Sequence, residues 1–173
     1  ARYLGGAEDA GRPVAAFIDE PGHYAVGLAA EGDRSWQTNH ANLREVLWTS
    51  YAEGGSGAEW YFGYSTAGGT GGDLDMEDFS LRESAYAWAA SARRFFEGLP
   101  LEEMRDGDAL TSGTNGPDQV LAKKGEVYAI YLPDGGSATL DLSGVSGGFD
   151  VSWYDVVKGT YHTGSVASVS GGT

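Results

Sequence analysis

The side chains best suited to chemistry in this chain are carboxylates and aromatic rings that follow two short apolar runs. The first run, residues 13–19, leads directly to Glu20, and His23 and Tyr24 come soon after it. The second run is residues 58–62, and three rings lie in it or just beyond it: Trp60, Tyr61 and Tyr64. Enzymes of the α/β class gather ligands beyond the carboxyl ends of parallel strands. We therefore expect any chemistry of this chain at the ends of these two runs.

The elements that must hold these residues follow a strand and helix pattern. The run at 13–19 is mostly apolar and is closed by a Pro-Gly pair, which is typical of a strand buried on both faces of a parallel sheet. Residues 36–53 carry apolar side chains at helical spacing, and Gly54 and Gly55 end the pattern. This order predicts two neighbouring parallel strands joined by a helix.

A second helix is predicted at 80–97. Ser80 and Glu83 have the spacing of a capping box, which marks a helix N-terminus. The apolar residues of this stretch share one helical face: Leu81, Ala85, Trp88, Ala89, Ala92, Phe95 and Phe96. We interpret residues 13–97 as two successive βα units.

Beyond residue 100 the pattern changes to short alternating runs separated by turn residues. Strands are expected at 126–132, 137–142, 149–154 and 160–162. Residues 99–114 join this part to the helices. The pattern predicts a small antiparallel β-sandwich, so the expected fold class is α/β plus all-β, with domains at 1–100 and 101–173. A sandwich usually needs one more strand, so we expect truncation at both ends.

The composition argues against several classes of partner. The chain has 25 acidic against 11 basic residues and a formal charge of -14, which repels phosphate backbones and anionic lipids. Neither nucleic acid nor a membrane is therefore an expected partner. Cysteine is absent, so disulfides, thiolate catalysis and sulfur-bound metals are excluded.

No metal or cofactor is predicted. Asp73, Asp75 and Glu77 have the first spacing of a calcium loop, but Asp78 stands where that loop requires glycine. We interpret these carboxylates mainly as favourable charges at a helix N-terminus. The histidines are scattered, and His40 is interpreted as a surface or interhelix packing residue.

Several motifs occur in an order that resembles a family of bacterial multidomain glycoside hydrolases. They are Gly-Ala-Glu-Trp-Tyr-Phe-Gly-Tyr at 57–64, the acidic stretch at 73–79, the tyrosine-rich run at 126–133, Asp-Leu-Ser at 141–143 and Trp-Tyr-Asp at 153–155. In that family a (β/α)8 barrel is followed by a β-sandwich labelled as collagen-binding. The resemblance covers nearly the whole chain and implies the terminal βα units of a TIM-type barrel followed by that sandwich.

The resemblance also implies roles for the residues at the ends of the runs. It places Glu20 at the end of the seventh barrel strand, as the nucleophile of a retaining glycoside hydrolase. Such an enzyme needs a second carboxyl about 5 Å away as general acid, and the family carries it on an earlier strand outside this chain. The fragment alone is thus expected to be inactive. The sugar-binding residues implied are Trp60, Tyr61, Tyr64, His23 and Tyr24.

Simpler interpretations remain open. Glu20 could cap the following loop or pair with Arg12 or Arg34, and Asp19 could compete for the nucleophile role, because neighbouring strand residues face opposite ways. The same alternation places one of Trp60 and Tyr61 in a core, and it places one of the rings at 153 and 154 in the core and leaves the other exposed on the opposite face.

Two functions follow from these alternatives. The first is a fragment of a secreted carbohydrate-active enzyme that acts on polysaccharide or oligosaccharide. The second is a non-catalytic or structural module whose sandwich binds carbohydrate or an extracellular protein such as collagen. Both predict a secreted, periplasmic or cell-surface location. Exposed strand edges in a fragment also predict self-association.

Overall fold

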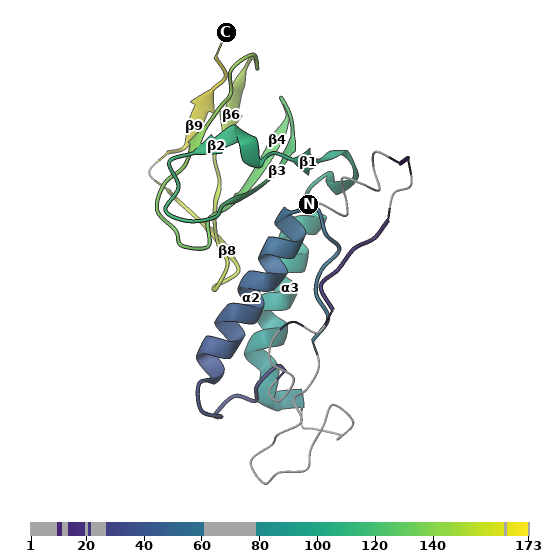
Figure 1. Cartoon of the computed structure of the whole chain (residues 1–173). Helices are drawn as coiled ribbons and strands as arrows, with labels where there is room; N and C mark the ends of the chain where they lie inside the picture. The colour runs from purple at the N-terminus through teal and green to yellow at the C-terminus, as the bar shows by residue number, and fades with distance from the viewer. Residues whose placement is uncertain are drawn as a thin grey trace. The chain divides into compact units, whose positions relative to one another are not determined.

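The computed structural model describes residues 10–11, 14–19, 21, 27–60, 79–164 and 166–172 (Figure 1). The chain divides into two compact units. The first, here called the helical unit, takes its described residues from 2–51 and 55–90. The second, here called the β unit, takes them from 52–54 and 91–173. The expected domain boundary after residue 100 stays a prediction.

Both predicted helices are confirmed. Helix α2 spans Trp36–Ala52, and helix α3 spans Glu83–Glu97 after a single 3-10 turn, η1, at Phe79–Arg82. The apolar spacing read from the sequence explains part of their packing, because Leu43 and Leu47 of α2 and Ala85 and Trp88 of α3 are buried as predicted. Trp48 of α2 is also buried, although the pattern did not single it out. Neither described α-helix has the length and hydrophobicity that crossing a bilayer requires.

The two apolar runs lie next to each other in parallel, as predicted. Ile18 and Ala58 form a parallel bridge, in which Ile18 N donates to Gly57 O at 3.1 Å and Glu59 N donates to Ile18 O at 2.9 Å. Helix α2 connects the two runs in the sequence. The described residues therefore show one β-α-β arrangement, and the barrel remains an inference from the resemblance.

The expectation that the first run is buried on both faces is wrong for the described residues. Phe17 is 56% exposed, and Val14 and Ile18 are also exposed. An inner strand of a parallel sheet is buried only when neighbouring strands and helices cover it. In the described part of the chain, this run has one bridge to a neighbouring segment and no covering layer on Phe17.

The described residues of the β unit form nine short strands, which confirms the predicted all-β class for this part of the chain. Their bounds are β1 (Arg105–Asp106), β2 (Thr111–Ser112), β3 (Gln119–Lys123), β4 (Val127–Tyr131), β5 (Thr139–Leu140), β6 (Gly148–Asp150), β7 (Trp153–Asp155), β8 (Thr160–His162) and β9 (Ser168–Ser170). They pair as β1-β3-β4, β2-β5, β6-β9 and β7-β8. Every one of these pairs is antiparallel, as expected.

The sequence patterns located some of these strands and missed others. Strands β4 and β8 lie where they were expected, and β5 is shorter than its predicted run. The single strand predicted at 149–154 is two strands, β6 and β7. Strands β1, β2, β3 and β9 were not predicted.

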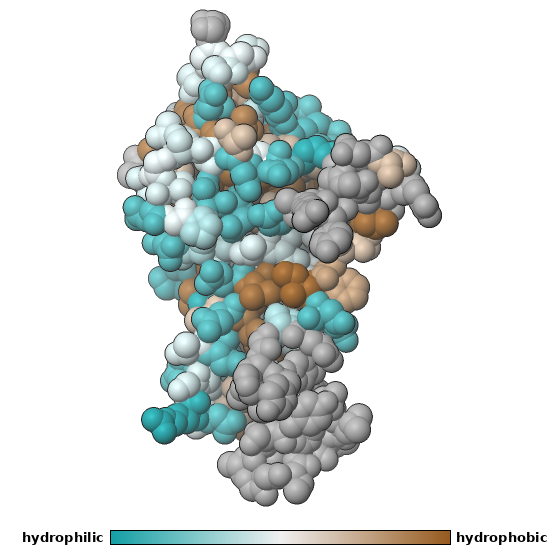
Figure 2. Space-filling model, in the orientation of Figure 1, coloured by the Kyte–Doolittle hydropathy of each residue, from teal (hydrophilic) through white to brown (hydrophobic). Residues whose placement is uncertain are grey.

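The core of the β unit forms around β3 and β4. Met104, Leu121 and Ala129 are buried together, and the partly buried residues packed against them are Phe95, Leu99, Leu101 and Val127. An edge-to-face contact joins β4 to β6, since the rings of Tyr128 and Phe149 lie 5.6 Å apart. Hydrophilic residues cover much of the molecular face seen in Figure 2, and the apolar ones gather in small patches.

Candidate functional site

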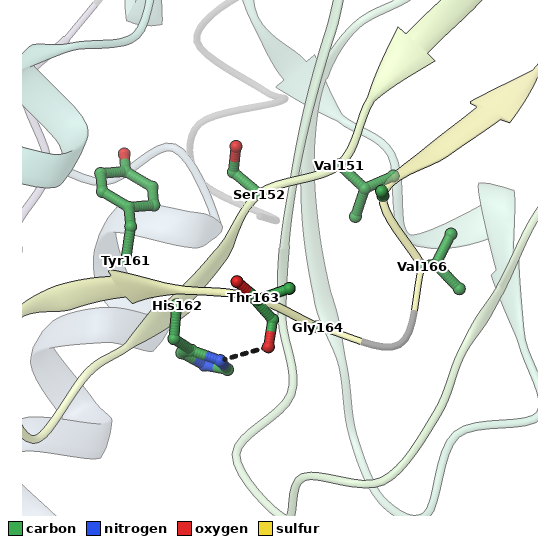
Figure 3. A pocket seen from close by; sticks show the side chains of 8 residues that line it. Val151, Ser152, Tyr161, His162, Thr163, Gly164 and Val166 are labelled. Carbon is green, nitrogen blue, oxygen red and sulfur yellow. Dashed lines mark hydrogen bonds between the residues drawn. The ribbon is translucent and has the colours of Figure 1, made fainter.

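The surface of the β unit contains an open hollow of about 340 Å³ (Figure 3). Its walls come from Val151 and Ser152, from residues 161–164, and from Val166 and Ala167. These residues belong to the ends of two hairpin ladders, β6-β9 and β7-β8, and to the segments that connect them. The hollow therefore lies where one ladder passes into the next.

The hollow lies beside two connecting segments that differ in length. Two residues, 151–152, join β6 to β7, whereas five residues, 163–167, join β8 to β9. Val151 N still donates to Ala167 O at 2.8 Å, so the segments are held together at one end. A five-residue segment cannot pair one-to-one with a two-residue segment, so strand pairing is interrupted between the two ladders.

Tyr161 is the most prominent ring in the lining. It is 64% exposed, although it lies in the middle of β8 and is the direct strand partner of Tyr154. The two rings meet edge to face at a centroid distance of 4.9 Å, and Phe95 lies 6.4 Å from Tyr161. One side of the Tyr161 ring is thus supported by aromatic residues while the rest remains open to a ligand.

Tyr154 is itself held in place. Its Oη lies 2.5 Å from Ser91 Oγ and also donates to Ser91 O at 3.3 Å. Its ring packs against Phe95 at 4.9 Å. The turn between β7 and β8 comes equally close to Ser91, because a side chain at Gly159 would collide with the Ser91 hydroxyl. Gly159 also has a φ of 69°, which a residue with a side chain rarely adopts.

Trp153 supports the longer connecting segment from the other face of β7. Its Nε1 donates to Val166 O at 3.1 Å, and any side chain at Gly164 would collide with the indole ring. Tyr154 instead contacts Ser91 and Phe95. The rings of Trp153 and Tyr154 therefore lie on different faces of β7, as the strand alternation predicted. Both rings are half-buried, whereas the prediction had placed one in the core and the other in solvent.

Asp155 closes the turn that precedes Tyr161. Its Oδ1 accepts hydrogen bonds from Val157 N and Lys158 N, both at 2.9 Å, and its Oδ2 pairs with Lys158 Nζ at 3.1 Å. The backbone N–H of Lys158 and then its side chain hold the pKa of Asp155 below the usual value. A carboxylate that satisfies turn amides in this way fixes the hairpin.

The chemistry of the lining suits binding. None of the eight lining residues is a carboxylate, an amide or a cysteine. Valine side chains give it apolar surface, Ser152 and Thr163 supply hydroxyls, and His162 supplies an imidazole whose Nδ1 lies 3.4 Å from Thr163 O. The arrangement offers a ring to stack on and groups that donate hydrogen bonds.

Most of the site residues predicted from the sequence lie outside the described residues: Glu20, His23, Tyr24, Tyr61 and Tyr64. Trp60 is described, and its half-buried ring meets the edge of the buried Trp88 at 4.9 Å. This contact fits the core role that the alternation left open for Trp60. Asp19, the competing carboxylate, is exposed. The roles of these residues in sugar chemistry remain predictions.

His40 packs between the helices, which is one of the two roles expected for it. It is buried, with Nε2 at 2.8 Å from Ala29 O and Nδ1 at 3.2 Å from Ser84 Oγ. Ser84 N also donates to Glu31 Oε1 at 2.7 Å, and this bond lowers the pKa of Glu31. Among the described residues no three His, Asp or Glu side chains are grouped as a metal site requires. The acidic stretch at 73–77 lies outside them.

Sequence reasoning did not single out Tyr161 or the hollow. The available signal was weak: Tyr161 lies at the centre of the predicted strand at 160–162, and a tyrosine there is as compatible with a core as with a binding surface. The exposure of its ring depends on what packs against β8 in the folded chain, which no local pattern shows.

The comparisons with known proteins concern the same part of the chain. Residues 107–172 match a family model described as "Putative collagen-binding domain of a collagenase". The match contains strands β2 to β9 and all the residues that line the hollow. No curated protein and no solved structure matches the chain. The sandwich part of the resemblance is therefore supported, and the match does not reach the helical unit.

Proposed function

We propose that residues 107–172 form a non-catalytic module that binds an extracellular protein of the collagen type. The observation that carries this proposal is the family match over these residues. The hollow supports it, because an open ring beside hydroxyl groups suits binding. Such a function places the protein outside the cell or on its surface.

The test is direct binding of the full chain to immobilised native collagen, measured by surface plasmon resonance. Heat-denatured collagen and an unrelated extracellular protein serve as ligand controls. Saturable binding to native collagen is expected. Binding to neither form of collagen would overturn the proposal, and binding to an array of polysaccharides instead would assign the module to carbohydrate.

A second candidate function concerns the helical unit and is favoured by its parallel bridge. Ile18 pairs with Ala58 across helix α2, and Phe17 beside it is left exposed. Both features are expected of strands that belong to a larger parallel sheet. We propose that a longer parent protein completes this sheet as a glycoside hydrolase barrel, with Glu20 as its nucleophile.

This second proposal is tested on the parent protein that contains the chain. Glu20→Gln is expected to lower the turnover of a glycoside substrate by roughly 10³-fold or more, as loss of a nucleophile does. Asp19→Asn is the matched control, because it changes the neighbouring carboxylate of the same run. Unchanged turnover in Glu20→Gln would remove Glu20 from catalysis, and loss in Asp19→Asn alone would transfer the role to Asp19.

A further inference from the structure

Tyr161 combines exposure with a fixed orientation. Among the described large hydrophobic residues it has the most exposed side chain, at 64%. Its ring is nevertheless restrained, because its strand partner Tyr154 is hydrogen-bonded to Ser91 and contacts it edge to face. A ring that is ordered before a ligand arrives loses little conformational entropy on binding. This is the property of an anchor residue in a binding site.

The other residues that line the hollow extend away from Tyr161 in one direction. In Figure 3, Tyr161 lies at one end of the lining, Val151 and Val166 lie at the other, and Ser152 and Thr163 lie between them. A ligand that follows this line meets a ring, then hydroxyl groups, then aliphatic side chains. That sequence of contacts suits an extended chain better than a compact ligand.

The hydrogen-bonding groups distinguish two classes of extended ligand. Every hydroxyl of a sugar both donates and accepts, so a sugar is best held by carboxylate and amide groups as well as by rings. The eight lining residues include no carboxylate and no side-chain amide. A polyproline II chain has no internal hydrogen bonds and exposes carbonyl oxygens, which only accept. Hydroxyl groups such as those of Ser152 and Thr163 can donate to them.

We infer that the hollow binds a proline-rich polyproline II chain, with a proline ring on Tyr161 and chain carbonyls facing Ser152 and Thr163. Proline-rich segments dock on aromatic-lined grooves in this way because their shape is preformed. This inference rests on the proposed function, since collagen consists of three such chains. Beyond collagen binding, it names Tyr161 as the residue that contacts a proline ring, and Ser152 and Thr163 as the residues that contact chain carbonyls.

The test compares Tyr161→Ala with a matched control in the full chain. The probe is a synthetic triple-helical peptide of Gly-Pro-Pro repeats, and the measurement is its dissociation constant by isothermal titration calorimetry. Tyr161→Ala is expected to weaken binding about tenfold, as loss of one stacked aromatic ring does. Tyr161→Phe keeps the ring and is expected to bind nearly as wild type. Tyr86→Ala is the control, because Tyr86 is 40% exposed but lies in the helical unit, outside the lining.

The outcomes separate this inference from the proposed function. If the wild type binds neither the peptide nor native collagen, both are overturned. If the wild type binds collagen but Tyr161→Ala binds equally well, the function stands and this site is wrong. If Tyr161→Ala loses binding to a polysaccharide and the wild type ignores the peptide, the hollow is a sugar site. Circular dichroism of each variant checks that the β unit remains folded.

Discussion

Phe17 in the helical unit and Tyr161 in the β unit are both strand-like aromatic residues with more than half of the side chain exposed. Their surroundings differ. Phe17 belongs to a run whose described β contact is a single bridge, whereas Tyr161 belongs to a paired hairpin and rests against another ring. An exposed ring that rests against other rings, like Tyr161, indicates a binding surface. An exposed ring without such contacts, like Phe17, indicates a face that another segment should cover. This difference predicts that substitutions in packed parts of the chain cost more stability than substitutions at Phe17.

The largest effect is expected from the core of the helical unit. Trp88 is 5% exposed and contacts Trp60, so Trp88→Ala is expected to destabilise this unit by about 3–5 kcal/mol. Urea unfolding, monitored by the circular dichroism signal of the helices, measures this loss. Tyr86→Ala, at a 40%-exposed position of the same helix, is the control and should cost clearly less than Trp88→Ala. A loss below about 1 kcal/mol for Trp88→Ala would contradict a packed core here.

A smaller effect is expected at the turn that supports Tyr161. Asp155→Ala removes the acceptor of two turn amides and is expected to cost about 1 kcal/mol. The pKa of Asp155 is lowered in the folded state, so its contribution is complete above the unfolded value of about 3.9 and is lost as the pH falls through the folded pKa. Urea unfolding at a series of pH values measures it.

Asp155→Asn is the matched variant for this turn. It keeps an oxygen that can accept from the turn amides but cannot titrate, so the stability difference between it and the wild type should shrink below about pH 4. A difference that stays constant through the acid range would show that the carboxylate charge contributes nothing to the hairpin.

The smallest effect on stability is expected at Phe17. Phe17→Ser should change the free energy of unfolding by no more than about 0.5 kcal/mol, because the ring is mostly exposed, but it should reduce self-association through this face. Analytical ultracentrifugation measures the association. Val157→Ser is the control, because Val157 is 62% exposed in the β7-β8 turn. A wild type that stays monomeric at high concentration would remove the self-association hypothesis.

The helices could be predicted from the sequence because their signals are local. The apolar spacing of α2 and α3 repeats over several turns, and glycines end both patterns. The parallel pairing of the two runs was also predictable, since a helix of this length joins them. Their burial was not, because it depends on which other segments cover the two runs, and that is a tertiary property.

The strands of the β unit were harder to predict for opposite reasons. Strand β3 carries four consecutive buried residues, so it lacks the alternation that marks a half-exposed strand. Strand β9 consists of Ser168, Val169 and Ser170, a run too short and small to stand out. The break between β6 and β7 depends on the pairing with β8 and β9, which is a tertiary property.

The candidate site was missed because its decisive features are not local. Tyr161 is exposed although it is paired within β8, and its support comes from Tyr154, which is bonded to Ser91, a residue 63 positions before Tyr154 in the chain. The class of module could be anticipated from motif order, since the run at 126–133 and the motif at 153–155 both lie within the matched family region. The contact surface could not.

The longer of the two connecting segments, at 163–167, is a position where the ligand that the hollow binds can change while the fold stays the same. The five-residue segment at 163–167 lies between the last residue of β8 and the first residue of β9, so residues added within it lie outside both ladders. Doubling such a loop costs only about 0.6 kcal/mol in closure entropy. Insertions at this one place could therefore redesign the edge of the hollow for new ligands while Tyr161 and its supporting rings stay unchanged.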